Sequence, residues 1–577
     1  MQYADPAEAG FDTAELAAAK ADWENLSSSA FMVIADGAVV TAWGATDRRF
    51  MCHSVRKSFL SAIFGIYWDR DEMELNKTLA DVGIDEQGEG LLESEEQARI
   101  LDLLKARSGV FHPAAYAGRT DSRPRGSEGP GRYFAYNNWD FNTLATILEK
   151  ETGDSVFEAF DEHFAQPLRM EDWRPSDGYF HYELDKSKHP AYPFRLSARD
   201  AARFGLLFAR EGRWGDERIL SRQWVRRSTA LYSKDNEQFG YGFMWWVALE
   251  PRFADHGFVA ARGVGRQMIV SLPDLDMVIV NRANTYRGEG TEYQELLNLM
   301  EKVINARTGE AVAAPRLVPL ADVTQPPRTA PGHRMPMADL AGEWPHPPAP
   351  LGLPQQATLR IIDRGDYLIV DAPFAGTFRH YPQEDGWFLE EDSLDRYLPI
   401  YDDDGKPAGL ADAATVAQAA IAARARGDQK AARRHLARIP AGEGTQAKRT
   451  SRGSPDLSIR IADALLDLFE RPKRAEKNLQ SLLAEDEVRA NRVEGRINVI
   501  GYQFMRADKL AEAQQVFELN TRLFPQAFNT WDSLGEVYMN QEKNAAAIES
   551  YQRSLELNPE NRNAEAMIER MASGGGT

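Results

Sequence analysis

The chain has almost no cysteine and none of the short motifs that bind metals or nucleotides. Its 577 residues contain one cysteine, Cys52, which excludes an internal disulfide and a zinc site built from several thiolates. A single thiol also means that nothing requires an oxidising compartment. Because HExxH, a Walker loop and a dinucleotide-binding fingerprint are all absent from the sequence, no metal and no cofactor is predicted.

Positive charge is also scarce. The chain has 68 Lys and Arg against 87 Asp and Glu, a formal net charge of −19. Binding to a phosphate backbone needs clustered Lys and Arg, so the composition disfavours nucleic acid as a partner. We interpret the one basic stretch, residues 424–452, as a solvated helix face and loop.

Long apolar segments are missing as well. The longest run is about ten residues, which is too short to span a bilayer. The N-terminal sequence MQYADPAEAGF lacks the basic region and the apolar region of a signal peptide. As written, the sequence predicts a cytoplasmic protein, or a periplasmic or secreted one if a leader was removed, so the compartment stays open.

The chain does have enough apolar residues for several cores. Its length and its 43% hydrophobic content predict a multidomain globular protein. Periodicity, turn residues and proline content divide it into an α+β domain over 1–310, a proline-rich linker over 311–337, a small β-barrel or sandwich module over 338–408, a helical region over 409–496 and a repeat region over 497–577.

Within residues 1–310, the spacing of apolar residues is that of a helix in some segments and that of a strand in others. Asp36-Gly37 joins two β-rich runs and predicts a hairpin. Residues 239–281 predict a meander in which 241–247 and 267–272 alternate. Helices are predicted over residues 12–26, 54–69, 101–106, 197–211 and 292–307, and Tyr136-Asn137-Asn138 is predicted to open a further helix that ends near Gly153. Together these elements predict an antiparallel sheet flanked by helices, with a helical subdomain.

The C-terminal region contains an internal repeat. At an offset of 34 residues, matching residue types are Gly501 with Gly535, Phe504 with Tyr538, Ala513 with Ala547, Phe517 with Tyr551, Leu523 with Leu557 and Pro525 with Pro559. This period, with small residues where helices touch and a proline after the second helix, is typical of tetratricopeptide helix pairs. We expect residues 457–496 to pack beneath the repeats and residues 563–571 to cap them.

The stretch Ser54-Val-Arg-Lys57 stands at the start of a strongly apolar predicted helix. A hydroxyl and an amine three residues apart lie on one helix face, so the amine can take the proton of the hydroxyl. Burial in that helix would lower the pKa of Lys57 towards the value that a general base needs. The pair is therefore a candidate nucleophile and base.

Two further motifs follow, Tyr136-x-Asn138 and then Ala261-Arg-Gly263 just before a predicted strand. The three motifs in this order resemble those of the penicillin-recognising serine hydrolases, the family of serine β-lactamases, penicillin-binding proteins and related esterases. The segments at 104–110, 112–116 and 189–195 look like those of the esterase and nylon-oligomer-hydrolase branch. The resemblance covers residues 1 to about 306.

The resemblance implies a role for each residue of the first two motifs. Ser54 matches the nucleophile that is acylated, and Lys57 matches the amine that activates it. Tyr136 matches the phenol that helps to move the serine proton, and a nearby cationic lysine would lower the pKa of this phenol. Asn138 matches the amide that hydrogen-bonds Lys57 or the substrate.

The third motif would supply the other side of the site. By the same resemblance, the backbone N–H groups of Ser54 and Val264 would form an oxyanion hole. Gly263 and Gly265 would leave the strand edge open for substrate. Where many β-lactamases have a Lys-Thr pair that anchors a carboxylate, this chain has Ala261 and Arg262. Arg262 can still bind a carboxylate through two hydrogen bonds, but β-lactam hydrolysis becomes less expected.

Other conspicuous residues have simpler interpretations. Tyr116 lies in a long irregular stretch, residues 108–131, and would either contact the scissile bond or be structural. Structural or packing roles are predicted for Cys52, His53, His189, His256, Trp245 and Trp246, although one of the two tryptophans could form a wall of the pocket.

These observations predict a serine hydrolase that cleaves an ester or amide bond of a small-molecule or peptide-like substrate through a Ser54 acyl-enzyme. A β-lactamase or D-alanyl carboxypeptidase is the alternative reaction. A different class of function is an inactive hydrolase-like domain that serves as a binding module, with the repeats recruiting a protein partner or a second copy of the chain.

Overall fold

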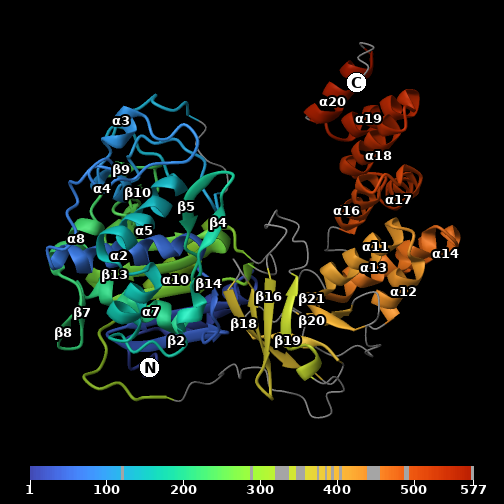
Figure 1. The fold of residues 1–577 in the computed structure, drawn as a ribbon. Coiled ribbons are helices and arrows are strands. Elements are labelled where there is room, and N and C mark those ends of the chain that lie inside the picture. The colour runs from blue at the N-terminus through green and yellow to red at the C-terminus, as the bar shows by residue number, and fades with distance from the viewer. Residues whose placement is uncertain are drawn as a thin grey trace. The chain divides into compact units, whose positions relative to one another are not determined.

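The computed structural model describes residues 1–117, 123–285, 290–318, 337–345, 358–372, 376–383, 386–391, 396–401, 406–437, 455–485, 493–559 and 561–572. One compact unit is built from Met1–Pro326, and a second from most of the chain beyond Pro326 (Figure 1). Within the described ranges, no helix is both long enough and apolar enough to cross a membrane.

The first unit is organised around an antiparallel sheet with the strand order β2-β1-β14-β13-β12-β11-β10-β9. The tight hairpin expected at Asp36-Gly37 is present, and β1 also pairs with β14 so that Val33 lies opposite Ile279. The strands are β1 Ala30–Ala35, β2 Ala38–Gly44, β9 Ser233–Lys234, β10 Phe239–Tyr241, β11 Trp246–Ala248, β12 Val259–Gly263, β13 Gln267–Leu272 and β14 Met277–Arg282.

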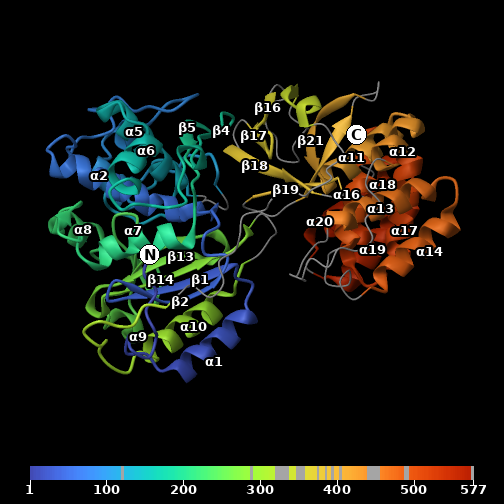
Figure 2. The same cartoon turned by 90° about the horizontal axis from the view of Figure 1, so that it is seen from below.

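Helices cover both faces of this sheet. α1 (Thr13–Glu24) and α10 (Tyr293–Asn305) lie side by side on one face, and α7 (Ala198–Ala209) covers the other (Figure 2). Because both faces are covered, all six residues of β13 are buried. The predicted alternation over 267–272 is therefore wrong: a strand between two helical layers is apolar on both sides.

Most of the remaining helices of the first unit form a subdomain beside the sheet. They are α2 Arg56–Asp69, α3 Glu93–Glu96, α4 Ile100–Leu104, α5 Asn138–Thr152, α6 Val156–Phe160 and α8 Arg222–Ser228. The short α9, Pro251–Ala254, instead follows β11. α5 begins at Asn138, within the segment 136–138 that was predicted to open it, because the Asn137 side chain accepts a hydrogen bond from the backbone N–H of Trp139 and caps the helix there. Tyr136 consequently lies just before the helix.

One predicted strand is broken. Residues 241–247 were expected to form a single strand, but β10 ends at Tyr241 and β11 begins at Trp246. Met244, with φ at 59°, turns between them. Its backbone is held by α2 and α4, since its N–H donates to the Leu104 carbonyl at 3.1 Å and its carbonyl accepts from Ser58 Oγ at 2.7 Å. These tertiary hydrogen bonds override the local strand preference.

The second unit begins with a seven-stranded antiparallel meander. Five of its strands were predicted, whereas β15 and β21 were not, and β21 occupies residues assigned to the start of the helical region. A Cβ built at Gly409 in β21 would lie 3.6 Å from Trp344 Cβ in β15. The first and last strands therefore approach each other, as in a barrel. The strands are β15 Gly342–Pro345, β16 Thr358–Asp363, β17 Leu368–Ala372, β18 Gly376–Pro382, β19 Phe388–Glu390, β20 Arg396–Tyr401 and β21 Pro407–Asp412.

Antiparallel helix pairs follow, and they confirm the expected repeat region. The helices are α11 Ala413–Ala425, α12 Gln429–Ala437, α13 Pro455–Leu468, α14 Pro472–Leu483, α16 Val493–Arg506, α17 Leu510–Leu523, α18 Phe528–Asn540, α19 Asn544–Leu557 and α20 Arg562–Ala572. A Cβ at Gly501 would lie 2.4 Å from the Phe517 ring, and one at Gly535 would lie 3.0 Å from the Tyr551 ring. The repeated glycines thus mark where paired helices touch.

The predicted linker, residues 311–337, lies mostly outside the described residues. Its first part packs on the first unit. The Val312 N–H donates to the Glu8 carbonyl at 2.9 Å, and the Val318 N–H donates to the Tyr3 carbonyl at 2.8 Å. Residues up to 318 therefore extend the first unit beyond the predicted boundary at 310.

Candidate active site

Ser54 lies in a tight turn directly before α2. The turn is a short 3-10 helix, His53–Val55, that continues into α2 at Arg56. His53 has a φ of 49°, a left-handed backbone that non-glycine residues adopt rarely. The Arg56 N–H donates to the His53 carbonyl and so closes the turn. Ser54 thus begins the buried helix, as the sequence predicted.

Lys57 and Tyr136 converge on the Ser54 hydroxyl. Lys57 Nζ lies 2.9 Å from Ser54 Oγ and 2.6 Å from the Tyr136 hydroxyl oxygen. The amine is also 4.3 Å from the centroid of the Tyr136 ring and 4.6 Å from that of Phe141. Lys57 is 1% exposed, so no bulk water competes for these contacts. Proton transfer between the three groups is geometrically possible.

Burial sets the protonation of both partners. Desolvation, followed by the like charge of Arg56, holds the pKa of Lys57 well below its usual value, as expected. The pKa of Tyr136 was expected to fall, but burial raises it above 10.0 despite the opposing effects of Ser54, Arg56 and Arg262. The expected lowering is wrong because desolvation of the phenol outweighs the nearby cations. Burial thus favours the neutral amine of Lys57 and the neutral phenol of Tyr136.

The end of β12 lies against the turn that carries Ser54. A Cβ at Gly263 would lie 2.4 Å from the Cys52 carbonyl oxygen and 3.1 Å from the Ser54 nitrogen. Only glycine lets the two backbones approach this closely. Beyond it the chain turns at Gly265, whose φ is 75°, and the Val264 side chain is 64% exposed. The third motif is thus adjacent to Ser54.

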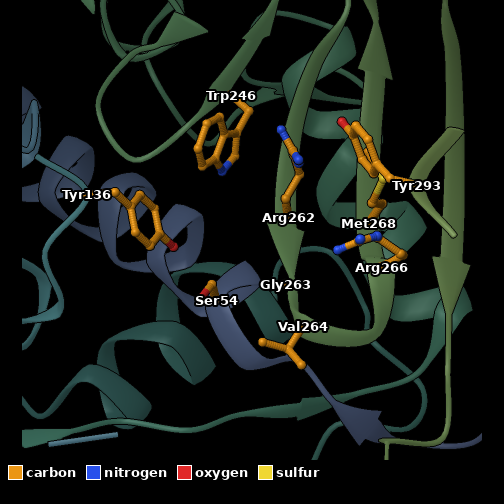
Figure 3. Close-up of a pocket in the computed structure, with 9 residues that line it drawn as sticks. All are labelled: Ser54, Tyr136, Trp246, Arg262, Gly263, Val264, Arg266, Met268 and Tyr293. Carbon is orange, nitrogen blue, oxygen red and sulfur yellow. The ribbon is translucent and has the colours of Figure 1, made fainter. Parts of the chain in front are cut away.

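A pocket of about 220 Å³ opens between these elements. Figure 3 shows Ser54 and Tyr136 on one side, and the Arg262 side chain standing between Trp246 and Tyr293 on the other. The residues that line it are Ser54, Tyr136, Trp246, Arg262, Gly263, Val264, Arg266, Met268 and Tyr293. Two arginines and no carboxylate side chain appear among them, so the pocket suits a negatively charged group.

Arg262 is held by aromatic rings. Its guanidinium carbon lies 4.5 Å from the ring centroids of Phe239 and Trp246, and 4.4 Å from that of Tyr293. Its Nη1 is buried and has no hydrogen-bond partner among the described residues, and the same is true of the Tyr293 hydroxyl. Burial lowers the pKa of Arg262, but a guanidinium stays protonated. The site presents an unsatisfied cation.

Two predicted site residues lie beside this pocket without lining it. Asn138 was expected to bond Lys57 or substrate, but its side-chain nitrogen donates to the Tyr116 carbonyl at 2.8 Å. Its Oδ1 is buried and has no partner within the described ranges. The Tyr116 hydroxyl lies 2.9 Å from His53 Nδ1. Both residues therefore tie the loop before α5 to the turn at Ser54.

The sequence alone missed three of the lining residues, Arg266, Met268 and Tyr293. Trp245 and Trp246 were interpreted as sheet core, with one of them able to form a wall of the pocket. Trp245 is fully buried, whereas Trp246 lines the pocket and stacks 5.5 Å from the Tyr136 ring. Arg266 and Met268 follow the third motif closely, so proximity in sequence could have indicated them. No sequence pattern indicated Tyr293. This tyrosine opens α10, 30 residues after the third motif ends at Gly263, and only the packing of α10 on the sheet places it at the pocket.

The other residues given structural roles are confirmed in part. Cys52 is fully buried. His189 is buried and bonds Thr146 and the Asp85 carbonyl. His53 has polar partners on both ring nitrogens, Tyr116 and Thr285. Among the residues described, no cluster of three or more His, Cys, Asp or Glu side chains could hold a metal ion.

The fold and this site define a class of protein in which a serine beside a lysine lies at one edge of an antiparallel sheet. Residues 16–299 match the Beta-lactamase family, and residues 528–561 match the Tetratricopeptide repeat. The first unit is therefore a beta-lactamase family domain, and the second carries a tetratricopeptide repeat.

Solved structures similar to the chain share low identity with it. SurE is 15% identical with a TM-score of 0.39, over 70% of this chain and 97% of that chain. A class C beta-lactamase is 13% identical with a TM-score of 0.39, over 51% and 95%. The penicillin binding protein from Bacillus halodurans is 14% identical with a TM-score of 0.38, over 50% and 99%. No curated protein matches the chain.

Proposed function

We propose that the first unit is a serine hydrolase that acts through an acyl-enzyme on Ser54. The observation that carries the proposal is the contact of Lys57 Nζ with both Ser54 Oγ and the Tyr136 hydroxyl, at 2.9 and 2.6 Å. The membership of residues 16–299 in the beta-lactamase family supports it.

Acylation begins when neutral Lys57 takes the proton of the Ser54 hydroxyl. The serine oxygen attacks the carbonyl carbon of the ester or amide and a tetrahedral intermediate forms. Its C–O or C–N bond then breaks, and the leaving group takes a proton from the Tyr136 and Lys57 pair. Water next attacks the acyl carbon and gives a proton to the same pair. The bond between the acyl carbon and Ser54 Oγ then breaks, Ser54 Oγ takes that proton back from the pair, and the acid leaves. Atoms and protons balance over the cycle.

Backbone groups stabilise the negative charge on the substrate oxygen in this scheme. The Ser54 N–H lies at the start of α2, where unpaired N–H groups favour negative charge. The Val264 N–H, at the end of β12, is the second donor. The close approach of Gly263 to Ser54 nitrogen supports this pairing. Each oxyanion donor contributes about 3 to 4 kcal/mol to lowering the barrier in hydrolases of this type.

The preferred substrates carry a carboxylate near the scissile bond. The unpartnered Nη1 of Arg262 supports this, because a carboxylate would complete its hydrogen bonding. A peptide-like ester or amide with a free carboxylate meets this requirement, and so does a β-lactam or a D-alanyl peptide.

Active-site labelling tests the proposal. A fluorophosphonate probe should modify Ser54, as mapped by peptide mass spectrometry, and the Ser54→Ala variant should remain unmodified. Hydrolysis of paired p-nitrophenyl esters with and without a terminal carboxylate then reports substrate preference, and nitrocefin reports β-lactamase activity. Equal labelling of the wild type and Ser54→Ala would exclude Ser54 as the nucleophile.

The tetratricopeptide repeat supports a second role, the binding of a protein partner or of a second copy of the chain. Sedimentation of the full chain over a range of concentrations distinguishes these two. A mass that rises with concentration indicates self-association, and a constant monomer mass contradicts it.

A further inference from the structure

Arg56, between the proposed nucleophile and its base, is a fully buried cation. Its side chain is 0% exposed. The guanidinium donates to the His53 carbonyl at 3.2 Å and to Asn142 Oδ1 at 3.4 Å, and its carbon lies 5.3 and 4.9 Å from the ring centroids of Tyr116 and Tyr192. Among the residues that the structure describes, these partners are neutral, and none is a carboxylate.

A buried cation without a counter-charge is costly. A guanidinium cannot relieve the cost by losing its proton, because it stays charged in proteins. Its field is also weakly screened, so it acts strongly on ionisable neighbours. Lys57 follows Arg56 directly and is buried as well. Protonation of Lys57 would place a second positive charge beside the first, which disfavours the ammonium form.

Burial favours the neutral form of the other titratable groups around Lys57. Burial first, then the neighbouring cations, lowers the pKa of His53 to about 4. Burial raises the pKa of Tyr136, Tyr192 and Tyr241, and also that of Asp140 at the start of α5. Arg262 of β12 acts on Tyr136. Arg56 is therefore the charged neighbour that acts on Lys57 itself.

Arg56 also holds the backbone beside Ser54. Its main-chain N–H and its guanidinium both donate to the carbonyl of His53, the residue with the left-handed backbone. The His53 ring joins the Tyr116 hydroxyl at 2.9 Å to Thr285 Oγ1 at 2.8 Å. The same guanidinium lies over the Tyr116 ring. The Arg56 side chain therefore contacts both the turn at His53 and the loop that packs on this turn.

We infer that Arg56 is a positioning residue for the acylation of Ser54, whose buried charge favours the neutral amine of Lys57 and whose hydrogen bonds hold the strained turn at His53. This inference rests on the proposed function. Arg56 thus has two effects, one of its charge on Lys57 and one of its hydrogen bonds on the turn at His53. Different substitutions remove them.

Two variants of the full chain separate the two effects. Arg56→Met removes the charge and the donors but keeps the length, and Arg56→Gln removes the charge and keeps a donor. An apolar replacement of a buried ion is often tolerated, and thermal unfolding checks that each variant folds.

The measurement is the rate of Ser54 labelling by a fluorophosphonate as a function of pH. In this reaction Ser54 Oγ bonds to phosphorus, fluoride leaves and the serine proton passes to Lys57. We expect Arg56→Met and Arg56→Gln to shift the acid limb to higher pH by about one unit, because Lys57 then holds its proton more tightly. Arg56→Met should also lower the plateau about tenfold through loss of position.

Arg282→Met is the matched control. Arg282 is also fully buried, and it donates to the Phe50 and Leu196 carbonyls and to Cys52 Sγ. Loss of the Arg282 guanidinium should change the temperature of thermal unfolding. It should leave the acid limb of the Ser54 labelling profile at the wild-type pH. Superimposable profiles for wild type, Arg56→Met and Arg56→Gln would overturn the inference, and so would an equal shift in Arg282→Met. Absence of Ser54 labelling in the wild type would instead overturn the proposed function.

Discussion

Two walls meet at Ser54, and they differ in how their polar groups are satisfied. The proton-transfer wall consists of Lys57 and Tyr136, and Lys57 Nζ lies 2.9 Å from Ser54 Oγ and 2.6 Å from the Tyr136 hydroxyl oxygen. The arginine wall consists of Arg262, Arg266 and Tyr293. There, Arg262 Nη1, Arg266 Nε and the Tyr293 hydroxyl are buried and lack partners within the described part of the chain.

The difference separates chemistry from recognition. A wall whose groups already satisfy one another is preorganised, so it needs no rearrangement when the reaction begins. Buried donors without partners are costly, and a ligand that satisfies them gains that free energy on binding. We therefore expect substitutions in the proton-transfer wall to lower kcat, and substitutions in the arginine wall to change KM in a substrate-dependent way.

The largest effect is expected for Lys57→Met. Methionine has a similar length and fits the apolar surroundings, but it cannot accept the serine proton. Labelling of Ser54 should fall by about 10³-fold or more, as measured with the fluorophosphonate probe. Lys105→Met, at a lysine that lies over the Tyr232 ring outside the pocket, is the control and should label normally. Normal labelling of Lys57→Met would remove Lys57 from the mechanism.

Tyr136→Phe should have the next largest effect. The ring keeps its stacking with Trp246 and loses only the hydroxyl that contacts Lys57. We expect kcat for ester hydrolysis to fall by about 10²-fold. Tyr241→Phe is the matched control, because its ring packs 5.8 Å from that of Tyr136. A similar loss in both variants would mean that packing, and not the Tyr136 hydroxyl, is responsible.

Arg262→Met tests the arginine wall. For an ester that carries a carboxylate, KM should rise by about 10- to 100-fold, since a charge-assisted pair is lost. For the matched neutral ester, kcat and KM should change little. Arg252→Met, at a surface arginine paired with Glu250 and Glu301, controls for net charge. Equal losses on both esters would assign Arg262 to structure and not to recognition.

The smallest effect is the shape of the pH profile. Because burial holds the pKa of Lys57 well below its usual value, the amine stays neutral to a lower pH than an exposed lysine does, and activity should fall only when acid protonates it. The raised pKa of Tyr136 keeps its phenol protonated beyond pH 10.0, so this residue should cause no alkaline limb. Steady-state hydrolysis against pH measures both limits, and an acid limb near the ordinary lysine pKa would contradict the buried-amine mechanism.

Much of the fold could be predicted because its signals are local. The hairpin at Asp36-Gly37 and the repeated glycines at 501 and 535 depend on backbone geometry within a few residues. The break between Tyr241 and Trp246 could not be predicted, because hydrogen bonds from distant helices draw Met244 out of the sheet. Strands β15 and β21 were missed because their sequences, GEWP and PAGLAD, do not alternate between large apolar and polar residues.

The sequence by itself determined the proton-transfer wall. Ser54 and Lys57 are three residues apart on one helix face, and Tyr136-x-Asn138 resembles a known motif, so these residues could be named without coordinates. Tertiary structure alone decided the arginine wall. Arg262, Trp246 and Tyr293 come from two strands and a helix and meet only through the pairing of β11 with β12 and the packing of α10 on the sheet. Side chains far apart in sequence share no local pattern, so the recognition surface could be identified only from the fold.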